Sequence, residues 1–260
     1  MTPTDPTPDR TPTRPTAPGP DRRSWRTAGA VVGAAVLAAA AAFVLTPGDP
    51  PGTPGQARTA PGVRPHALLL DGVAGRIEVT GTGGTTATAD FVPEGSTRPG
   101  PVAFHPTGAD GGLTLVCGTA GGAVAPCRGT LRVAVPAGTA LTLHQSAGET
   151  VLSGLDGDLD VAVTSARLTA VGLRAPRAGI TVDSASADLA FATAPGELAL
   201  RAASASVALR LPDTAEGEAY AVTSDAVSAD VRVAVPQTAD PAHVLRLSTV
   251  SASVAVLPTG

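Results

Sequence analysis

The chain has 260 residues, a formal net charge of −4 and 30 Gly and 25 Pro residues. All 18 basic residues are Arg, and Lys and Asn are absent, which indicates a very GC-rich genome of actinobacterial type. Because aromatic residues make up only 2% of this acidic chain, a core of Val, Leu and Ala is expected and a nucleic-acid-binding role is excluded.

Residues 1–27 are rich in Thr, Pro, Asp and Arg and show no apolar periodicity. Proline at this density blocks both helix and sheet hydrogen bonding, so the segment is predicted to be a disordered tail. Its Thr-Pro pairs at Thr2, Thr7 and Thr11 would suit a cytoplasmic kinase, although a solvated linker explains the same residues.

Residues 28–45 are free of charge and follow three arginines, Arg22, Arg23 and Arg26. A helix of this length spans about 27 Å, which is enough to cross a bilayer core. The flanking arginines place the tail in the cytoplasm and the rest of the chain outside the cell. The prediction is a single-pass anchor in the cell membrane. A cleavable signal peptide is the alternative, since residues 38–42 offer Ala-x-Ala sites.

Residues 46–65 hold six Pro and four Gly and are predicted to form an extended stalk. The domain beyond it is predicted to cover residues 66–258. Its charge differs from that of the tail: five Arg face three Asp before the apolar segment, while 13 Arg face 19 acidic residues after it. Residues 66–140 have less regular strand patterns and are expected to cap the repeats that follow.

Two cysteines, Cys117 and Cys127, flank a Gly- and Ala-rich loop between two predicted strands. Outside the membrane the environment is oxidising, so we expect a disulfide that closes this loop. Such a bridge would stabilise the domain by about 3 kcal/mol. No further metal ligands lie nearby in the sequence, and no metal, cofactor or catalytic residue is predicted.

From Leu141 to Leu257 one pattern returns six times: an apolar/polar alternation, a Ser in a small-residue corner, and a second alternation. The expected corner serines are Ser146, Ser165, Ser184, Ser204, Ser224 and Ser248. Alternation with a period of two indicates β-strands, and a repeat near 20 residues indicates an all-β, β-solenoid stack of short strands. A sandwich of hairpins is the alternative, because the same alternation would permit it.

Several polar side chains in the sequence have the chemistry of a metal or catalytic site. Asp156, Asp158 and Asp160 alternate and would suit Ca²⁺, but an acidic turn entering an outward strand face explains them equally. A pair of carboxylates would suit glycoside cleavage. However, three acids occupy similar places in different repeats, which favours solvated strand ends: Glu149, Asp188 and Asp230. His144 lies near Ser146, but no nucleophile elbow surrounds any serine.

The run 127–139, the run 153–160 and the serine-cornered repeats resemble the DUF4097 family of β-strand-repeat proteins, which are also labelled candidate adhesins. Family members often carry a Gly-Ser-Gly-Asp corner, where this chain has Ala in place of Gly in 184–188 and 204–206. The resemblance spans roughly residues 66 to 257. It implies an envelope-exposed β-repeat domain without established chemistry.

The sequence therefore predicts a membrane-anchored, non-enzymatic envelope protein whose extracellular domain contacts cell-wall glycan or an envelope protein. Two other functions stay open. The first is an accessory role in envelope-stress signalling, which only the Thr-Pro tail favours. The second is a polysaccharide-active β-helix enzyme.

Overall fold

The structure is a computed structural model, and it describes residues 56–59, 64–71, 73–94, 102–107, 112–117, 127–214, 219–238 and 242–259. All of them fall in the unit Asp49–Gly260. The predicted tail and membrane span lie outside the described residues. Within the described part, no helix is long and apolar enough to cross a membrane.

The described residues form two β-sheets and no helix. In spatial order, the ten-stranded sheet, called sheet A here, contains β1 (Gln56–Arg58), β4 (Thr88–Pro93), β7 (Cys127–Pro136), β3 (Val73–Thr82), β9 (Gly148–Ser153), β11 (Ala166–Leu173), β13 (Ser186–Phe191), β15 (Ser206–Leu211), β19 (Ser253–Pro258) and β17 (Asp230–Val233). The nine-stranded sheet, sheet B, contains β16 (Tyr220–Val227), β18 (His243–Val250), β14 (Glu197–Ala203), β12 (Arg177–Asp183), β10 (Leu159–Thr164), β8 (Ala140–Gln145), β2 (Ala67–Leu70), β6 (Gly112–Cys117) and β5 (Val102–Thr107).

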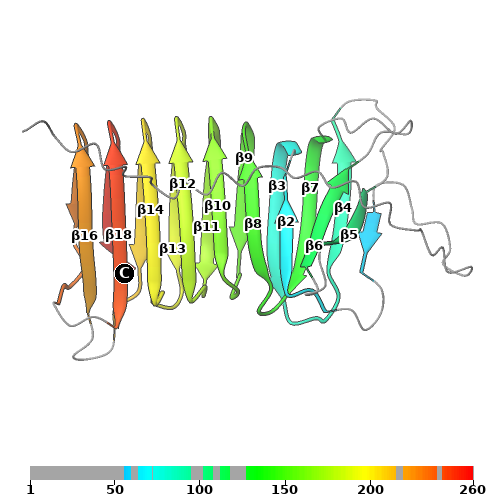
Figure 1. The fold of residues 1–260 in the computed structure, drawn as a ribbon, viewed down its shortest axis with the longest axis horizontal. Coiled ribbons are helices and arrows are strands. Elements are labelled where there is room, and N and C mark those ends of the chain that lie inside the picture. The colour runs from blue at the N-terminus through cyan, green and yellow to red at the C-terminus, as the bar shows by residue number, and fades with distance from the viewer. Residues whose placement is uncertain are drawn as a thin grey trace, which may run out of the picture. The chain divides into compact units, whose positions relative to one another are not determined.

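Consecutive strands from β8 to β15 alternate between the two sheets, and each pairs in parallel with the strand two places along the chain. We call one strand of each sheet and the corner that joins them a layer; Figure 1 shows the layers side by side. Among the described strands, only the pairs β1·β4, β4·β7 and β5·β6 are antiparallel. The prediction of an all-β fold from the strand alternation is confirmed.

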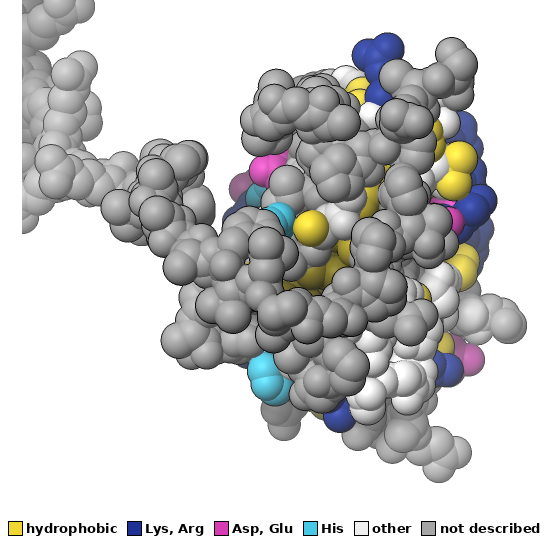
Figure 2. Space-filling model, turned by 90° about the vertical axis from the view of Figure 1, so that its right-hand side faces the viewer, with side chains coloured by type: hydrophobic (Ala, Val, Ile, Leu, Met, Phe, Trp, Pro, Cys, Tyr) yellow, Lys and Arg dark blue, Asp and Glu magenta, His cyan; other side chains and the backbone are white. Residues whose placement is uncertain are grey.

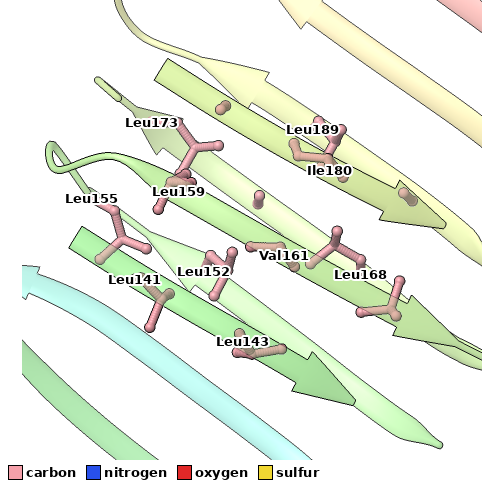
Figure 3. Packing of buried hydrophobic residues seen from close by; sticks show 14 of the residues in the cluster. Leu141, Leu143, Leu152, Leu155, Leu159, Val161, Leu168, Leu173, Ile180 and Leu189 are labelled. Atoms are coloured by element: carbon pink, nitrogen blue, oxygen red, sulfur yellow. The ribbon is translucent and has the colours of Figure 1, made fainter. Parts of the chain in front are cut away.

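The core lies between the two sheets and consists almost entirely of Leu, Val, Ile and Ala side chains. Residues such as Leu143, Leu168 and Leu189 have no exposed surface, while their sequence neighbours face outward. Figure 3 shows these side chains pointing into the space between the sheets. Burying one such side chain contributes about 2 kcal/mol, whereas ordering each residue costs about 1.5 kcal/mol. A layer therefore depends on its neighbours for stability.

Both ends of the stack depart from chain order. The first layer, β2–β3, lies between β6–β7 and β8–β9. The last layer, β18–β19, lies between β14–β15 and β16–β17. The antiparallel strands β1, β4 and β5 lie beyond β6–β7 at one end, whereas β2 and β3 of the segment 66–140 lie inside the stack. A capping role for residues 66–140 stays a prediction. β1 and the buried Thr59 belong to the segment predicted as a stalk, so the fold begins before residue 66.

Five corners between sheet B and sheet A contain a serine with φ between 49° and 51°. These are Ser165, Ser184, Ser204, Ser228 and Ser251. The predicted corners at Ser224 and Ser248 are wrong, because these residues lie within β16 and β18. Longer connections before β16 and after β17 shift the last two corners off the 20-residue period. Ser146 does lie in the bend between β8 and β9.

The left-handed conformation costs a residue other than Gly about 1–2 kcal/mol. Backbone hydrogen bonds between layers hold it in place. Ser184 N donates to Ala203 O at 2.9 Å, and Ser204 N donates to Val250 O at 3.0 Å. Each of the five serines precedes an alanine, so a Ser-Ala dipeptide marks this corner throughout.

Candidate interaction surface

One row of outward side chains crosses eight neighbouring strands of sheet A in register. We call it the polar row. From β7 to β17 its members are Thr130, Arg76, Glu149, Arg167, Ser186, Ser206, Ser253 and Asp230. All are half-buried or exposed. Because neighbouring strands lie about 4.8 Å apart, the row is about 34 Å long.

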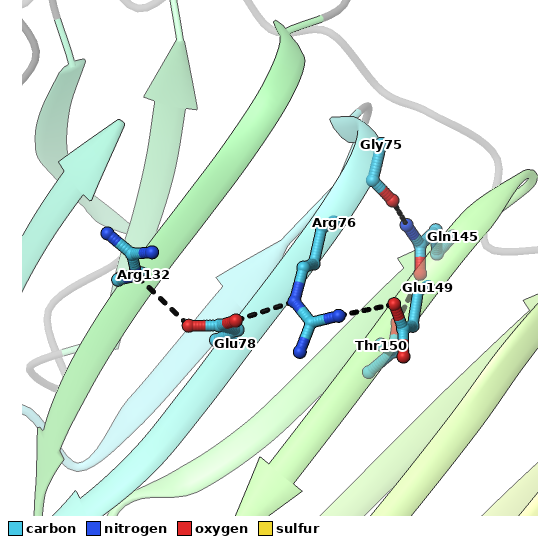
Figure 4. A network of polar contacts seen from close by, with 7 residues as sticks. All are labelled: Gly75, Arg76, Glu78, Arg132, Gln145, Glu149 and Thr150. Atoms are coloured by element: carbon cyan, nitrogen blue, oxygen red, sulfur yellow. Dashed lines mark hydrogen bonds and ion pairs between the residues drawn. The ribbon is translucent and has the colours of Figure 1, made fainter. Parts of the chain in front are cut away.

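The β7–β9 part of sheet A carries alternating charges, shown in Figure 4. Arg76 Nε donates to Glu78 Oε1 at 2.5 Å, and the same guanidinium donates to Glu149 Oε2 at 2.5 Å. Arg132 Nε donates to the other oxygen of Glu78 at 3.0 Å. The hydrogen bond from Arg76 lowers the pKa of Glu78, and Arg132 adds to this effect. Glu78 is therefore an ionised member of a charge network at neutral pH.

Beneath this network a buried polar contact joins the two sheets at their corner. Gln145 Nε2 donates to Gly75 O at 2.8 Å, and Thr150 Oγ1 donates to Gln145 Oε1. Gly75 lies beside Gly148 in the sheet, with φ values of 118° and 112°. These conformations favour glycine and bring the two backbones close together, and Gln145 links the Gly75 carbonyl to the Thr150 hydroxyl beside them. The corner therefore fixes the register of β3 against β9, and with it the charge network above.

The other half of the polar row carries hydroxyl groups. Ser186, Ser206 and Ser253 occupy equivalent positions on β13, β15 and β19, two residues after the corner serines. Their places follow from the sequence, because the repeated Ser-Ala-Ser puts one serine in the corner and the next on the outward face. This half therefore presents donors and acceptors without net charge until Asp230 on β17.

The outer face of sheet B carries isolated ion pairs. Arg177 donates to Asp158 at 2.5 Å, and this hydrogen bond raises the pKa of Arg177. Arg246 donates to Glu197 on the neighbouring strand. Figure 2, which views the end of the stack that carries β5, shows charged side chains of both signs on either flank and hydrophobic ones between them.

The three aspartates that would suit a calcium site contact different groups. Asp156 accepts a hydrogen bond from Gly138 N at 2.7 Å, and Asp158 pairs with Arg177. Asp160 is exposed on the outward face of β10. Among the described residues, no group of three His, Cys, Asp or Glu side chains is placed to hold a metal ion.

The other acids singled out in the sequence lie on the outer face of sheet A, but not in one place. Glu149 and Asp230 stand in the polar row on β9 and β17, with four strands between them, while Asp188 lies two residues after Ser186 on β13 and 4.0 Å from Arg210. His144 is exposed on the outer face of sheet B. The sequence could not pair Arg76 with Glu149, because 73 residues separate them and only the inserted position of β3 brings them together.

The backbone of Cys117 ends β6 in sheet B, and that of Cys127 begins β7 in sheet A. Their side chains lie outside the described part of the structure. The disulfide stays a prediction, and thiol counting with and without reductant would test it.

No family model matches the chain, and no curated protein matches it. Solved structures are similar to this chain, among them three candidate adhesion proteins. One is a candidate cell adhesion protein from Clostridium sporogenes, with 12% identity, a TM-score of 0.45, and coverage of 80% of this chain and 100% of that one. The second is a candidate adhesin from Bacteroides fragilis, with 11% identity, a TM-score of 0.40, and coverage of 75% and 93%. The third is a candidate adhesin from Parabacteroides merdae, with 12% identity, a TM-score of 0.35, and coverage of 78% and 95%.

At these identities and TM-scores the likenesses assign no function. The resemblance to the DUF4097 family therefore stays an expectation from the sequence. What this domain can do has to be argued from its own surface.

Proposed function

We propose that this chain is a non-enzymatic, membrane-anchored envelope protein of the DUF4097 type, from an actinobacterium. Its β-repeat domain would be a two-sheet β-solenoid held outside the cell by residues 28–45. The outer face of sheet A would make weak, multivalent contacts with cell-wall glycan or with an envelope protein. The observation that carries the proposal is the polar row, which repeats hydrogen-bonding groups at the strand spacing over about 34 Å.

A repeated row suits a repeating ligand because each equivalent position offers a similar weak contact. Linked weak contacts gain avidity even when each one alone is negligible. Because one half of the row is charged and the other half carries hydroxyl groups, such a ligand would bind in one preferred direction along the row. Glu149 of the polar row and the neighbouring Glu78 are both ion-paired with Arg76, which favours a structural over an acid–base role.

The test is co-sedimentation of the purified chain with isolated cell walls over a salt series. Two variants place the same new charge on opposite faces: Ser206→Glu in the polar row and Thr181→Glu on the outer face of sheet B. Saturable binding that Ser206→Glu weakens and Thr181→Glu leaves unchanged is the expected result. Equal effects of both variants would remove sheet A as the contact face.

An absence of binding at micromolar protein would contradict the adhesive role. The accessory signalling role would then be the better reading. A transcriptional response that is lost on deletion of residues 1–27 would support it.

A further inference from the structure

The layer β16–β17 ends the stack, and each of its strands has one strand neighbour among the described residues. Its inward side chains are less covered than those of inner layers. Ser224 and Ala226 are exposed, whereas Leu200 and Leu247, which align with Ser224 through β18, are 1% and 2% exposed. The end of the core therefore meets solvent at this layer.

The backbone at this end presents hydrogen-bonding groups in both sheets. Tyr220 N donates to Pro236 O, and Thr238 N donates to Tyr220 O, so the loop after β17 covers the start of β16. Alternate residues of a strand direct their backbone groups to the same side. Val222, Ser224 and Ala226 therefore face the edge as Tyr220 does.

In sheet A the same reasoning applies to β17. Asp230 N donates to the carbonyl oxygen of Ala252, just before β19, so the backbone groups of Asp230 and Arg232 point toward β19. Those of Val231 and Val233 point away from it. Both sheets thus end in an edge strand that can accept another strand.

We propose that this edge is a dimer interface, and that its occupant is a second copy of this chain related by a two-fold axis perpendicular to the sheets. The axis would pass through Val231, so that β17 pairs antiparallel with β17 of the second copy. Opposite residues then share a face of the sheet. Asp230 stands opposite Arg232 of the second copy, and Arg232 opposite Asp230 of the second copy. This register makes two opposite-charge pairs, while a shift by one position would place the two Arg232 side chains against each other.

The same two-fold axis can also pair β16 of sheet B with β16 of the second copy. Ala229 aligns with the buried Ala205 and Ala252, so Val231 is the second inward residue after the corner, and Ser224 is the second inward residue before it. An axis through both pairs Ser224 with its symmetry mate, and both Ser224 and Val231 direct backbone groups to the edge. Asp225 then faces Thr223 of the second copy rather than another acid. The small side chains of Ser224 and Ala226 allow this close approach.

The two ends of the stack differ, which favours a closed dimer over a filament. Beyond β6–β7 lie the antiparallel strands β1, β4 and β5 instead of a parallel layer. A contact made by one patch with its own copy closes after two subunits. Pairing through β16–β17 is therefore expected to stop at the dimer.

The test uses two charge reversals on the full chain in detergent. Asp230→Arg leaves two positive charges on β17, and Arg232→Asp leaves two negative charges. Each variant is made with two different affinity tags and co-purified in every combination. We expect the wild type to capture itself, each variant to capture itself at least about tenfold less well, and the two variants to capture each other. The double reversal, Asp230→Arg with Arg232→Asp, should restore self-capture.

The matched control is Arg201→Asp, which makes the same charge change on the outer face of sheet B. It should leave self-capture unchanged. Wild-type chains that fail to capture each other would overturn the proposal. Equal capture in every combination would overturn it too, because the contact would then lie elsewhere, for example in residues 28–45.

Discussion

Replacement of Gly148 by Ala tests the corner that fixes the first layer. A Cβ atom at this position would lie 1.9 Å from Gly75 O, 2.8 Å from Gly75 C and 3.0 Å from Gln145 Nε2. The contacted oxygen belongs to the backbone of β3, so it cannot move without disturbing the pairing of β3 with β9. The φ of 112° adds conformational strain for any residue with a side chain.

The two effects together set the magnitude. Strain of this kind costs about 1–3 kcal/mol, and overpacking costs about the same. We therefore expect Gly148→Ala to lower the free energy of unfolding by about 3–5 kcal/mol, a large share of a typical domain's stability. Urea denaturation followed by circular dichroism measures it.

The control is Gly83→Ala in the turn after β3, where an added Cβ meets no atom within 4 Å. It should change stability by less than about 1 kcal/mol. If the two alanine variants unfolded at the same urea concentration, the proposed close approach of the Gly75 and Gly148 backbones would be refuted.

Three further predictions concern a corner and two titrating groups. Ser204→Gly should alter the denaturation midpoint little, while Ser204→Val should destabilise by about 2 kcal/mol because its φ of 49° suits no β-branched residue; Ser206→Val, on a regular strand, is the control and should be tolerated. Burial raises the pKa of Tyr220 to about 12, and Asp213 adds to the shift, so its stabilising contribution is complete below pH 10 and is lost as the pH rises from about 10 to 12. The chain has one Tyr and no Lys, so melting curves over this range should show the loss in the wild type and not in Tyr220→Phe. The lowered pKa of Glu78 means that its contribution is complete above its unfolded pKa and is lost as the pH falls through its folded pKa, so Glu78→Gln should flatten the acid side of a melting-temperature profile.

The strand pattern of the middle layers could be predicted from the sequence because each layer repeats the same local signals. Apolar residues alternate through β12 to β15, and Ser184 and Ser204 occur at the expected interval. Alternation and the residues of a corner are local features, so they can be recognised without knowing which strands pair. The Ser-Ala dipeptide would also have located the true corners at Ser228 and Ser251, had it been preferred to a fixed period.

The charge network could not be predicted in the same way. Its members lie on β7, β3 and β9, and the partners of Arg76 depend on which strands flank β3. The spacing of strands along the sequence does not indicate which parallel strands pair, because a layer can stack on any layer with a matching face. A stack built strictly in chain order would separate Arg76 from Glu149, and nothing in the sequence indicates that β3 pairs with β9.

The order of the last two layers follows from their inward residues. β18 and β19 carry Leu245, Leu247, Val254 and Val256 inside, all buried. β16 offers Val222, Ser224 and Ala226 at aligned inward positions. If the layers followed chain order, the leucine-bearing layer would end the stack and Ser224 would be buried. The observed order instead buries the more apolar layer between two neighbours. Leu247 aligns with Ser224, and Leu245 exceeds Val222 by one methylene, so together they favour this order by about 3 kcal/mol. The same preference leaves at the edge a short, polar layer with charges of both signs on β17, the layer through which a second copy is proposed to bind.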